Sequence, residues 1–390
     1  MTDNNGRDMK KVLPRAYSLI KIVRFCFLLL IVVLLLWTVY HFREELNIDN
    51  FIRFVSYLDT GEVVESEAQF RFNTNPQNRF CAFKNGLAVL SPEGIIYVNP
   101  VGKEELSVKT AFSNPALQVN DKRLLAFDIG GKSLLMTSDY SVILNKTTDA
   151  AIINAQMNEK NWVALITNDE GYKSGLTVYN DRQHEVFRWQ TSENYLIDAD
   201  VAPGCKYLAV CASRYSEGEI VSSLVGFNLD SVEAMWQLDL GSVLAVSVNC
   251  LTDDRICVLT DSGLLFINRQ GEIIERFNFD GMTLKFFSDE GDGFLTLMFT
   301  RNRVGSMNLI MSMDYSGAII AEHETDEAIS QLKANKESVV TLSSDGITVY
   351  TRELKQRGIY PDASACRDIA VGPDGRVFGI LSNSAFKIQE

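Results

Sequence analysis

The chain has 390 residues, of which 46% are hydrophobic and 22% charged, values that are typical of a folded globular protein and argue against a disordered one. Its formal net charge of −13 is unevenly spread, because residues 1–43 carry +5 and the remainder therefore carries −18. Nucleic-acid-binding proteins need Lys and Arg to neutralise phosphates, so the acidic body argues against this class and we expect no nucleic acid partner.

A basic N-terminal tail leads into an apolar stretch. Phe25 to Phe42 is 18 residues long and contains no Lys, Arg, Asp or Glu, which places it at the lower edge of the length of a transmembrane helix. No small residues suited to signal-peptide cleavage follow it, so we expect the segment to remain as an anchor. Six of the seven positive charges in residues 1–43 precede it. The positive-inside rule then predicts a cytoplasmic tail over residues 1–24, a transmembrane helix over 25–42 and an extracytoplasmic body at the cell membrane.

A short amphipathic helix is expected within the juxtamembrane segment, residues 43–62. Phe51, Phe54, Val55 and Leu58 recur at the spacing of one helical face. This face has two interpretations. The favoured one is packing under the following domain, and the other is contact with the membrane or a partner.

Residues 63–390 contain a repeated pattern of an apolar, a small and another apolar residue. The small residues are Ala88, Ala126, Ala164, Ala209, Cys257, Thr296, Thr341 and Gly379, with a mean spacing of about 42 residues. Four-stranded propeller blades repeat at this period, and a small residue allows neighbouring blades to pack closely. The pattern predicts an all-β, eight-bladed β-propeller, with a seven-bladed ring as the alternative.

One copy shows the blade pattern most clearly, because Arg255 to Phe277 contains three runs of β-prone residues separated by Gly-containing turns. The last copy ends at Glu390 without an outer strand. The alternating segment Glu67 to Phe72 precedes the first copy, and we expect it to supply that strand and close the ring. Longer spacings are attributed to insertions such as Ser213 to Glu219 and Arg301 to Ser306.

The sequence offers no constellation of catalytic, cofactor-binding or metal-ligating residues. The acidic run Asp289 to Gly293 lacks the alternating ligands of a calcium loop and is interpreted as a solvated hairpin. Trp162, Trp189 and Trp236 lie in strand patterns and are expected in the core. The cysteines Cys81, Cys205, Cys211, Cys250, Cys257 and Cys366 show no metal-ligand spacing, so buried thiols are favoured and a disulfide is the alternative.

Two phrases resemble the quinoprotein-type repeat, in which a strand, a polar turn and a strand ending in Trp join one blade to the next. They are Leu176 to Trp189 and Leu224 to Gln237. The layout of one N-terminal span followed by a divergent propeller is similar to an uncharacterised bacterial family of membrane-anchored propeller proteins with quinoprotein-like or WD40-like repeats. That resemblance implies a fold and supplies no activity. A quinoprotein enzyme would need a quinone pocket, a catalytic Asp and a calcium ligand set.

Three functions remain open at this stage. The first is a non-enzymatic scaffold or adaptor that binds another envelope protein, anchored in the membrane through Phe25 to Phe42. The second is a ligand-binding sensor ectodomain that works with a membrane partner. The third is a quinoprotein-like enzyme, which the missing constellation disfavours. We expect the first, with no cofactor and no enzymatic activity.

Overall fold

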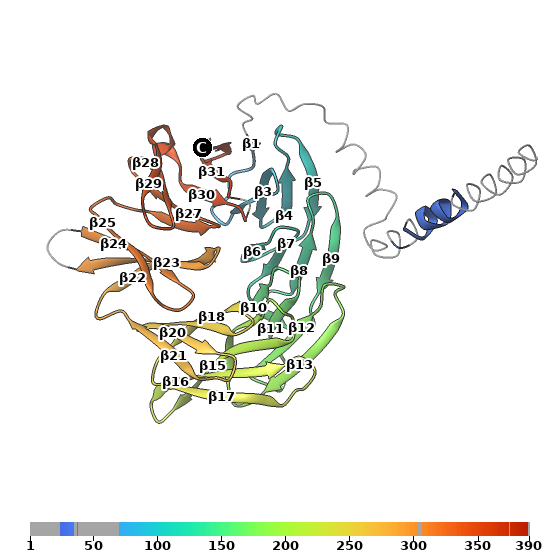
Figure 1. Ribbon diagram of the computed structural model, residues 1–390, viewed down its shortest axis with the longest axis vertical. Coiled ribbons are helices and arrows are strands. Elements are labelled where there is room, and N and C mark those ends of the chain that lie inside the picture. Colours follow the sequence, from blue (N-terminus) through green and yellow to red (C-terminus); the bar gives the residue numbers. More distant parts are fainter. Residues whose placement is uncertain (1–23, 35–36, 38–69, 303–305, 374, 389–390) are drawn as a thin grey trace, which may run out of the picture. The chain divides into compact units, whose positions relative to one another are not determined.

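The computed structural model describes residues 24–34, 37, 70–302, 306–373 and 375–388 (Figure 1). The chain divides into two compact units, Met1–Gly61 and Glu62–Glu390. In the first unit, residues 24–34 are helical and their apolar side chains are exposed. Among the residues described, no helix has both the length and the hydrophobicity needed to cross a membrane. The expected span over 25–42 lies only partly within them, and the expected tail before Arg24 and the helix within 43–62 lie outside them.

The second unit is a ring of eight four-stranded antiparallel sheets, which are the blades of a propeller (Figure 1). Blade 1 consists of β2 (Arg79–Phe83), β3 (Gly86–Ser91), β4 (Gly94–Val98) and β5 (Glu104–Lys109), blade 2 of β6 (Pro115–Val119), β7 (Leu124–Asp128), β8 (Ser133–Thr137) and β9 (Val142–Thr147), blade 3 of β10 (Ala151–Met157), β11 (Val163–Asn168), β12 (Ser174–Tyr179) and β13 (Glu185–Thr191), and blade 4 of β14 (Tyr195–Val201), β15 (Tyr207–Ser216), β16 (Glu219–Asn228) and β17 (Ala234–Gly241).

The second half of the ring follows the same order. Blade 5 consists of β18 (Ala245–Thr252), β19 (Arg255–Thr260), β20 (Gly263–Asn268) and β21 (Ile273–Asn278), blade 6 of β22 (Thr283–Gly291), β23 (Phe294–Asn302), β24 (Ser306–Asp314) and β25 (Ile319–Thr325), and blade 7 of β26 (Gln331–Asn335), β27 (Ser338–Ser343), β28 (Gly346–Thr351) and β29 (Gln356–Tyr360). A 3₁₀ helix, η1 (Pro361–Ala365), leads to blade 8, which contains β30 (Asp368–Val371), β31 (Val377–Ile380) and β32 (Ser384–Lys387).

The ends of the propeller close the ring. The fourth strand of blade 8 is β1 (Phe70–Arg71), which pairs with β32 in the register Phe70 to Ala385. Phe70 is buried, and its ring packs edge-to-face on Phe378 with the centroids 5.1 Å apart. The strand expected from Glu67 to Phe72 therefore occupies the predicted place, over the part of it that the structure describes.

The core of the ring lies between the blades. Each of the eight hydrophobic clusters found among the described residues combines side chains of two consecutive blades, and one of them joins blade 8 to blade 1. The predicted column of small residues lies on the second strands and is buried. At Gly379, a Cβ atom would approach the Cys366 sulfur to 2.7 Å, so the small residue is required there. The eight-bladed prediction is confirmed, and the seven-bladed alternative is wrong.

The turn between the third and fourth strands repeats one hydrogen-bond pattern in blades 1, 3, 5 and 6. In each turn one side-chain oxygen accepts hydrogen bonds from the backbone N–H groups two and four residues further along the chain. The accepting residues are Asn99, Asn180, Asn268 and Asp314. The residue three positions further on has positive φ, and it is Gly102, Gln183, Gly271 and Gly317 respectively. The Asn180 turn of blade 3 is the polar turn of the phrase Leu176 to Trp189, and it is an Asx turn like the others.

The two tryptophans of that phrase join blades, as the resemblance implies. Trp236 of blade 4 donates its Nε1–H to the Arg269 carbonyl of blade 5 at 2.7 Å, and its ring covers Gly271, where a Cβ atom would lie 2.6 Å from the indole. Trp189 of blade 3 packs on Phe227 of blade 4, with the ring centroids 4.9 Å apart. Both side chains are half-buried and pack against the hydrophobic clusters between blades, as does Trp162, so they lie at the edge of the core in which they were expected.

Candidate functional site

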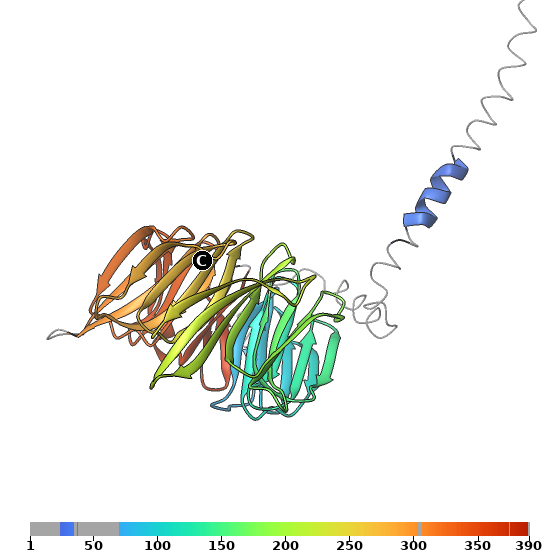
Figure 2. The same cartoon turned by 90° about the horizontal axis from the view of Figure 1, so that it is seen from below.

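The ring has two faces, because the strands run between them (Figure 2). The face that carries the hairpins between second and third strands, and the connections from one blade to the next, is called the hairpin face. In blade 4 the strands reach the hairpin face where Tyr195 pairs with Ser213 and where Ser222 pairs with Gly241. The opposite face carries the turns between first and second strands and between third and fourth strands. The first strands lie innermost, β14 beside β10 and β18, and β26 beside β22 and β30.

Carboxylates on the inner strands form the most unusual polar feature of the ring. Asp198 of β14 is buried, accepting a hydrogen bond from Asn154 Nδ2 of blade 3 at 2.8 Å and another from the Val248 N–H of blade 5 at 3.0 Å. Asp200 accepts the Cys250 N–H of blade 5 at 2.7 Å. With its amide nitrogen facing blade 6, Asn249 donates to Asp289 at 2.8 Å. These side chains therefore connect blades 3 to 6 around the centre of the ring.

Burial makes these carboxyl groups hard to ionise. It raises the pKa of Asp198 to about 6, against the opposing hydrogen bonds from Val248 and Ala199. Burial also raises the pKa of Asp200 to about 8, with the neighbouring Asp198 and Asp289 adding to the effect. The carboxyl groups of Asp198, Asp200 and Asp289 thus influence one another electrostatically at the ring centre.

This arrangement holds blades together and does not match the quinoprotein site. Among the described residues, no group of three or more His, Cys, Asp or Glu is placed to hold a metal ion. Oxygens of Asp198, Asp200 and Asp289 already accept N–H groups of neighbouring blades, whereas a calcium ligand set needs several free oxygens converging on one point. The carboxylates at the ring centre therefore do not fit the calcium ion and the quinone that a quinoprotein enzyme would hold.

The cysteines carry no exposed reactive group in the ring. Cys81, Cys211, Cys250 and Cys257 are buried free thiols, and burial raises the pKa of each. A thiol in this state is a poor nucleophile because the thiolate is the reactive form. Cys205 and Cys366 are half-buried and also free, so the expectation of buried thiols holds for four of these six cysteines, and no disulfide joins any of the six in the structure.

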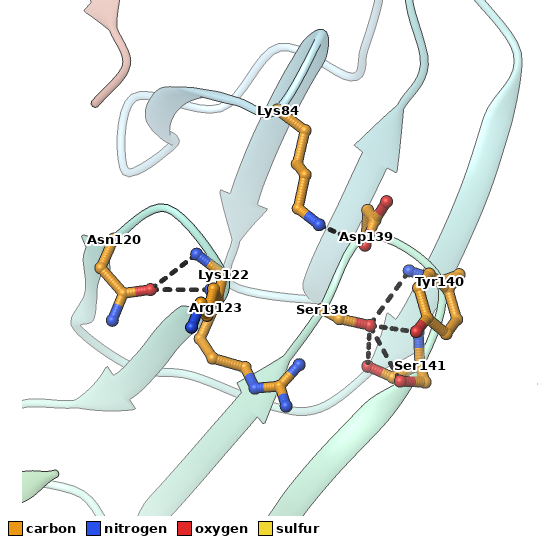
Figure 3. A network of polar contacts seen from close by, with 8 residues as sticks. All are labelled: Lys84, Asn120, Lys122, Arg123, Ser138, Asp139, Tyr140 and Ser141. Atoms are coloured by element: carbon orange, nitrogen blue, oxygen red, sulfur yellow. Dashed lines mark hydrogen bonds and ion pairs between the residues drawn. The ribbon is translucent and has the colours of Figure 1, made fainter. Parts of the chain in front are cut away.

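The opposite face is occupied by polar contacts that hold its own turns (Figure 3). Lys84 of blade 1 lies 3.5 Å from the buried carboxylate of Asp139 in blade 2. Ser138 Oγ accepts backbone N–H groups of the turn that follows it. Asn120 Oδ1 accepts two N–H groups of its own turn, while its Nδ2 donates to the Asn158 carbonyl of blade 3 at 2.9 Å. These groups stabilise turns and blade junctions.

The hairpin face, in contrast, exposes apolar side chains on five successive blades. They are Ile129, Tyr172, Tyr195, Tyr215, Ile220, Leu244, Val246 and Met307. Tyr215 is the most exposed, at 74%. Other exposed apolar side chains of the propeller are scattered, on turns of the opposite face at Val101 and Val232 and on outer strands at Val142, Val186, Met235, Ile274, Ile319 and Ile359. Gathered exposed apolar side chains mark interaction surfaces, whereas single ones are ordinary. The hairpin face is therefore the candidate binding site.

The comparisons with known proteins place the chain in a family. A model described as a family of unknown function (DUF5711) matches residues 59–359. The chain belongs to this family. The match covers blades 1 to 7 and ends before the strands β30 to β32 of blade 8. The search of curated proteins gave no match.

Solved structures share the propeller fold of this DUF5711 chain. The C-terminal WD40 domain of Sif2 has a TM-score of 0.56 at 10% identity, covering 84% of this chain and 98% of that one. Sqt1 of Chaetomium thermophilum, bound to the N-terminus of the ribosomal protein L10, has a TM-score of 0.54 at 10% identity, covering 83% and 100%. The quinohemoprotein alcohol dehydrogenase ADHIIG of Pseudomonas putida has 0.50 at 10%, covering 80% and 70%. At this identity the likeness shows the fold alone.

The sequence singled out no binding residue, and the structure refines two of its predictions. Asp289 to Gly293 was interpreted as a solvated hairpin; Asp292 and Gly293 do form the turn between β22 and β23, but Asp289 and Glu290 lie within the inner strand β22, which ends at Gly291. Ser213 to Glu219 was interpreted as an insertion, and it lengthens β15 and β16 into a projecting hairpin. The positive φ angles at Glu217 and Gly218 give the tight turn, so the Glu-Gly dipeptide was the available signal.

Proposed function

We propose that the protein is a non-enzymatic adaptor, which binds another protein through the hairpin face of its propeller. The observation that carries the proposal is the gathering of exposed apolar side chains on that face, with Tyr215 the most exposed. Propellers are rigid and present loops from every blade on each face, so they serve as binding platforms without catalytic groups. The likeness to WD40 domains supports a platform of this kind.

The second part of the proposal is that the adaptor is anchored in the cell membrane, with the propeller on the extracytoplasmic side. It rests on the 18 residues without charge from Phe25 to Phe42 and on the positive charges that precede them. The helix over residues 24–34, whose apolar side chains are exposed, supports it. An anchor raises the local concentration of the propeller for partners in the same membrane.

Two measurements test the proposal. The first treats intact cells with a membrane-impermeant protease, which should digest the propeller and leave the N-terminal tail intact. Protection of the propeller together with cleavage of the tail would reverse the assigned orientation.

The second measurement is affinity purification of the full chain from native membranes. The charge reversals Glu217→Lys and Glu219→Lys on the hairpin should reduce recovery of the partner. Glu217→Lys should leave the melting temperature unchanged, whereas Glu219→Lys also removes the hydrogen bond that Ser242 donates. Arg301, also on this face, is a further position for the same test. The matched control reverses the charges of Asp230 and Glu233, whose side chains are exposed on the opposite face of the same blade. Equal loss with both pairs of substitutions would contradict binding through the hairpin face, and purification of the chain alone would contradict the adaptor function. A small molecule recovered instead of a protein would favour the sensor.

A further inference from the structure

The hairpin between β15 and β16 projects beyond the rest of blade 4. The pairing of β14 with β15 begins at Tyr195 with Ser213, and that of β16 with β17 begins at Ser222. The pairs beyond these points belong to the hairpin alone. Among them, Tyr215 lies directly opposite Ile220, so both side chains are on the same side of the hairpin and both are exposed, at 74% and 49%.

Hydrogen bonds join this hairpin to the hairpin face of blade 5. Ser242 Oγ donates to the Glu219 carboxylate at 2.5 Å, and the Ala245 N–H donates to Ser222 Oγ at 3.1 Å. The connection between the blades is tied in turn to the β19–β20 turn, because the Leu244 N–H donates to Asp261 Oδ1 at 3.2 Å. Leu244 and Val246 on this connection are exposed. Tyr215 and Ile220 lie on the same side of the hairpin as Ser222, which accepts the Ala245 N–H of blade 5. Together with the exposed Leu244 and Val246 they define the apolar patch at the junction of blades 4 and 5, where these side-chain hydrogen bonds hold the hairpin and the connection.

Acidic side chains surround the patch. The exposed carboxylates on the hairpin face of these two blades are Glu193, Glu217, Glu219, Asp239, Asp261 and Asp280. The exposed bases toward this face of the two blades are Arg214 on the hairpin and Arg276 near the end of β21. Lys173 of blade 3 donates to the Glu193 carbonyl at 2.8 Å and lies 4.9 Å from the centre of the Tyr195 ring. Six exposed carboxylates against two exposed bases leave the rim of blades 4 and 5 net negative.

We propose that this patch binds a basic amphipathic segment of the partner protein, with apolar side chains seated on Tyr215, Ile220, Leu244 and Val246 and Lys or Arg facing the acidic rim. This inference rests on the proposed adaptor function and names the chemistry of its partner. Charge complementarity selects the occupant: a second copy of this chain would bring the same negative rim against itself, and an anionic lipid surface would be repelled. A neutral apolar segment would leave the carboxylates without counter-charges.

Site-specific photocrosslinking of the full chain in the cells that produce it tests the inference. A benzophenone side chain replaces Tyr215 in one variant and Val232 in the control, because Val232 is 60% exposed on the opposite face of the same blade. Mass spectrometry then identifies the segment joined to each position. The expected result is one protein segment at position 215, with a net positive charge and apolar residues, and its absence at position 232.

A second measurement compares how much of the crosslinked partner two double variants recover in low and in high salt. In each double variant, two carboxylates are replaced by neutral amides. Glu217→Gln with Glu219→Gln should lower recovery several-fold in low salt and flatten its salt dependence, because exposed charge pairs are screened by salt. Asp230→Asn with Glu233→Gln on the opposite face should leave both unchanged.

The outcomes separate the inference from the function on which it rests. A neutral or acidic protein segment at position 215, or salt dependence that both pairs of variants share, would overturn the basic segment while the adaptor function stands. Lipid alone at position 215, or no protein at any position of the hairpin face, would overturn both.

Discussion

The buried carboxylate of Asp198 should make the stability of the propeller depend on pH. Burial raises the pKa of this group to about 6 in the folded chain. Its pKa in the unfolded chain is about 3.9. The contribution of the group to stability is therefore fully present below about pH 4 and is lost as the pH rises through about 6. A difference of about two pKa units corresponds to about 3 kcal/mol in the free energy of unfolding.

The substitution Asp198→Asn removes this titration and keeps an oxygen that can accept the Val248 N–H. We expect the decrease in the free energy of unfolding between pH 4.5 and 7.5 to be smaller in the variant than in the unchanged chain, by about 2 kcal/mol. Loss of the Asp198 charge also reduces the rise in the pKa of Asp200, so both effects have the same sign.

Urea unfolding of the full chain in detergent, followed by tryptophan fluorescence at a series of pH values, measures this dependence. Trp162 and Trp189 pack in the cluster between blades 3 and 4 and report on the region around Asp198. Asp230→Asn serves as the control because it changes the net charge equally at an exposed position. An unchanged pH dependence in Asp198→Asn, or an equal change in the control, would refute the reasoning.

Other perturbations test the packing of the ring. Phe70→Ala should lower the free energy of unfolding by about 3–5 kcal/mol, because a buried phenylalanine is lost from the closing strand. Deletion through residue 72 should lower the melting temperature far more than deletion through residue 61, and equal melting temperatures would contradict closure by β1. Gly271→Ala should cost more than about 1 kcal/mol in chemical denaturation, because φ is +84° and a Cβ atom would meet Trp236. Gly379→Leu should give little folded protein on size-exclusion chromatography, since a Cβ atom at this position already meets the Cys366 sulfur at 2.7 Å.

The blade pattern could be predicted because it depends on local sequence. A second strand such as Val163–Asn168 is apolar along its length and is followed by a turn, and its small residue repeats at the period of a blade. Closure by β1 could also be predicted, since an incomplete last copy needs one further strand. The Asx turns at Asn99, Asn180 and Asn268 have a sequence signal as well, an Asn five residues before the outer strand begins.

The ring centre and the candidate site could not be predicted because they depend on contacts between blades. Asp289 belongs to a run that reads as a polar turn, and only the position of β22 beside β26 places it on an inner strand. Asp198 differs from an ordinary strand aspartate only through its partners in blades 3 and 5. Likewise, Tyr215 and Leu244 are separated along the chain and join one patch only when Ser242 connects the hairpin to blade 5.

Closure by the two ends also fixes when the ring can be finished during synthesis. Phe70 and its partner Ala385 are 315 positions apart. At about 5–20 residues per second, a ribosome needs about 15–60 s to travel between them. For that time the N-terminal strand has no partner, and the blades that have already formed present unpaired edges to one another and to other chains. A chain whose translation stops before blade 8 therefore never leaves this open state. Premature termination near the C-terminus should yield an unclosed chain that cellular quality control degrades, and not a smaller propeller.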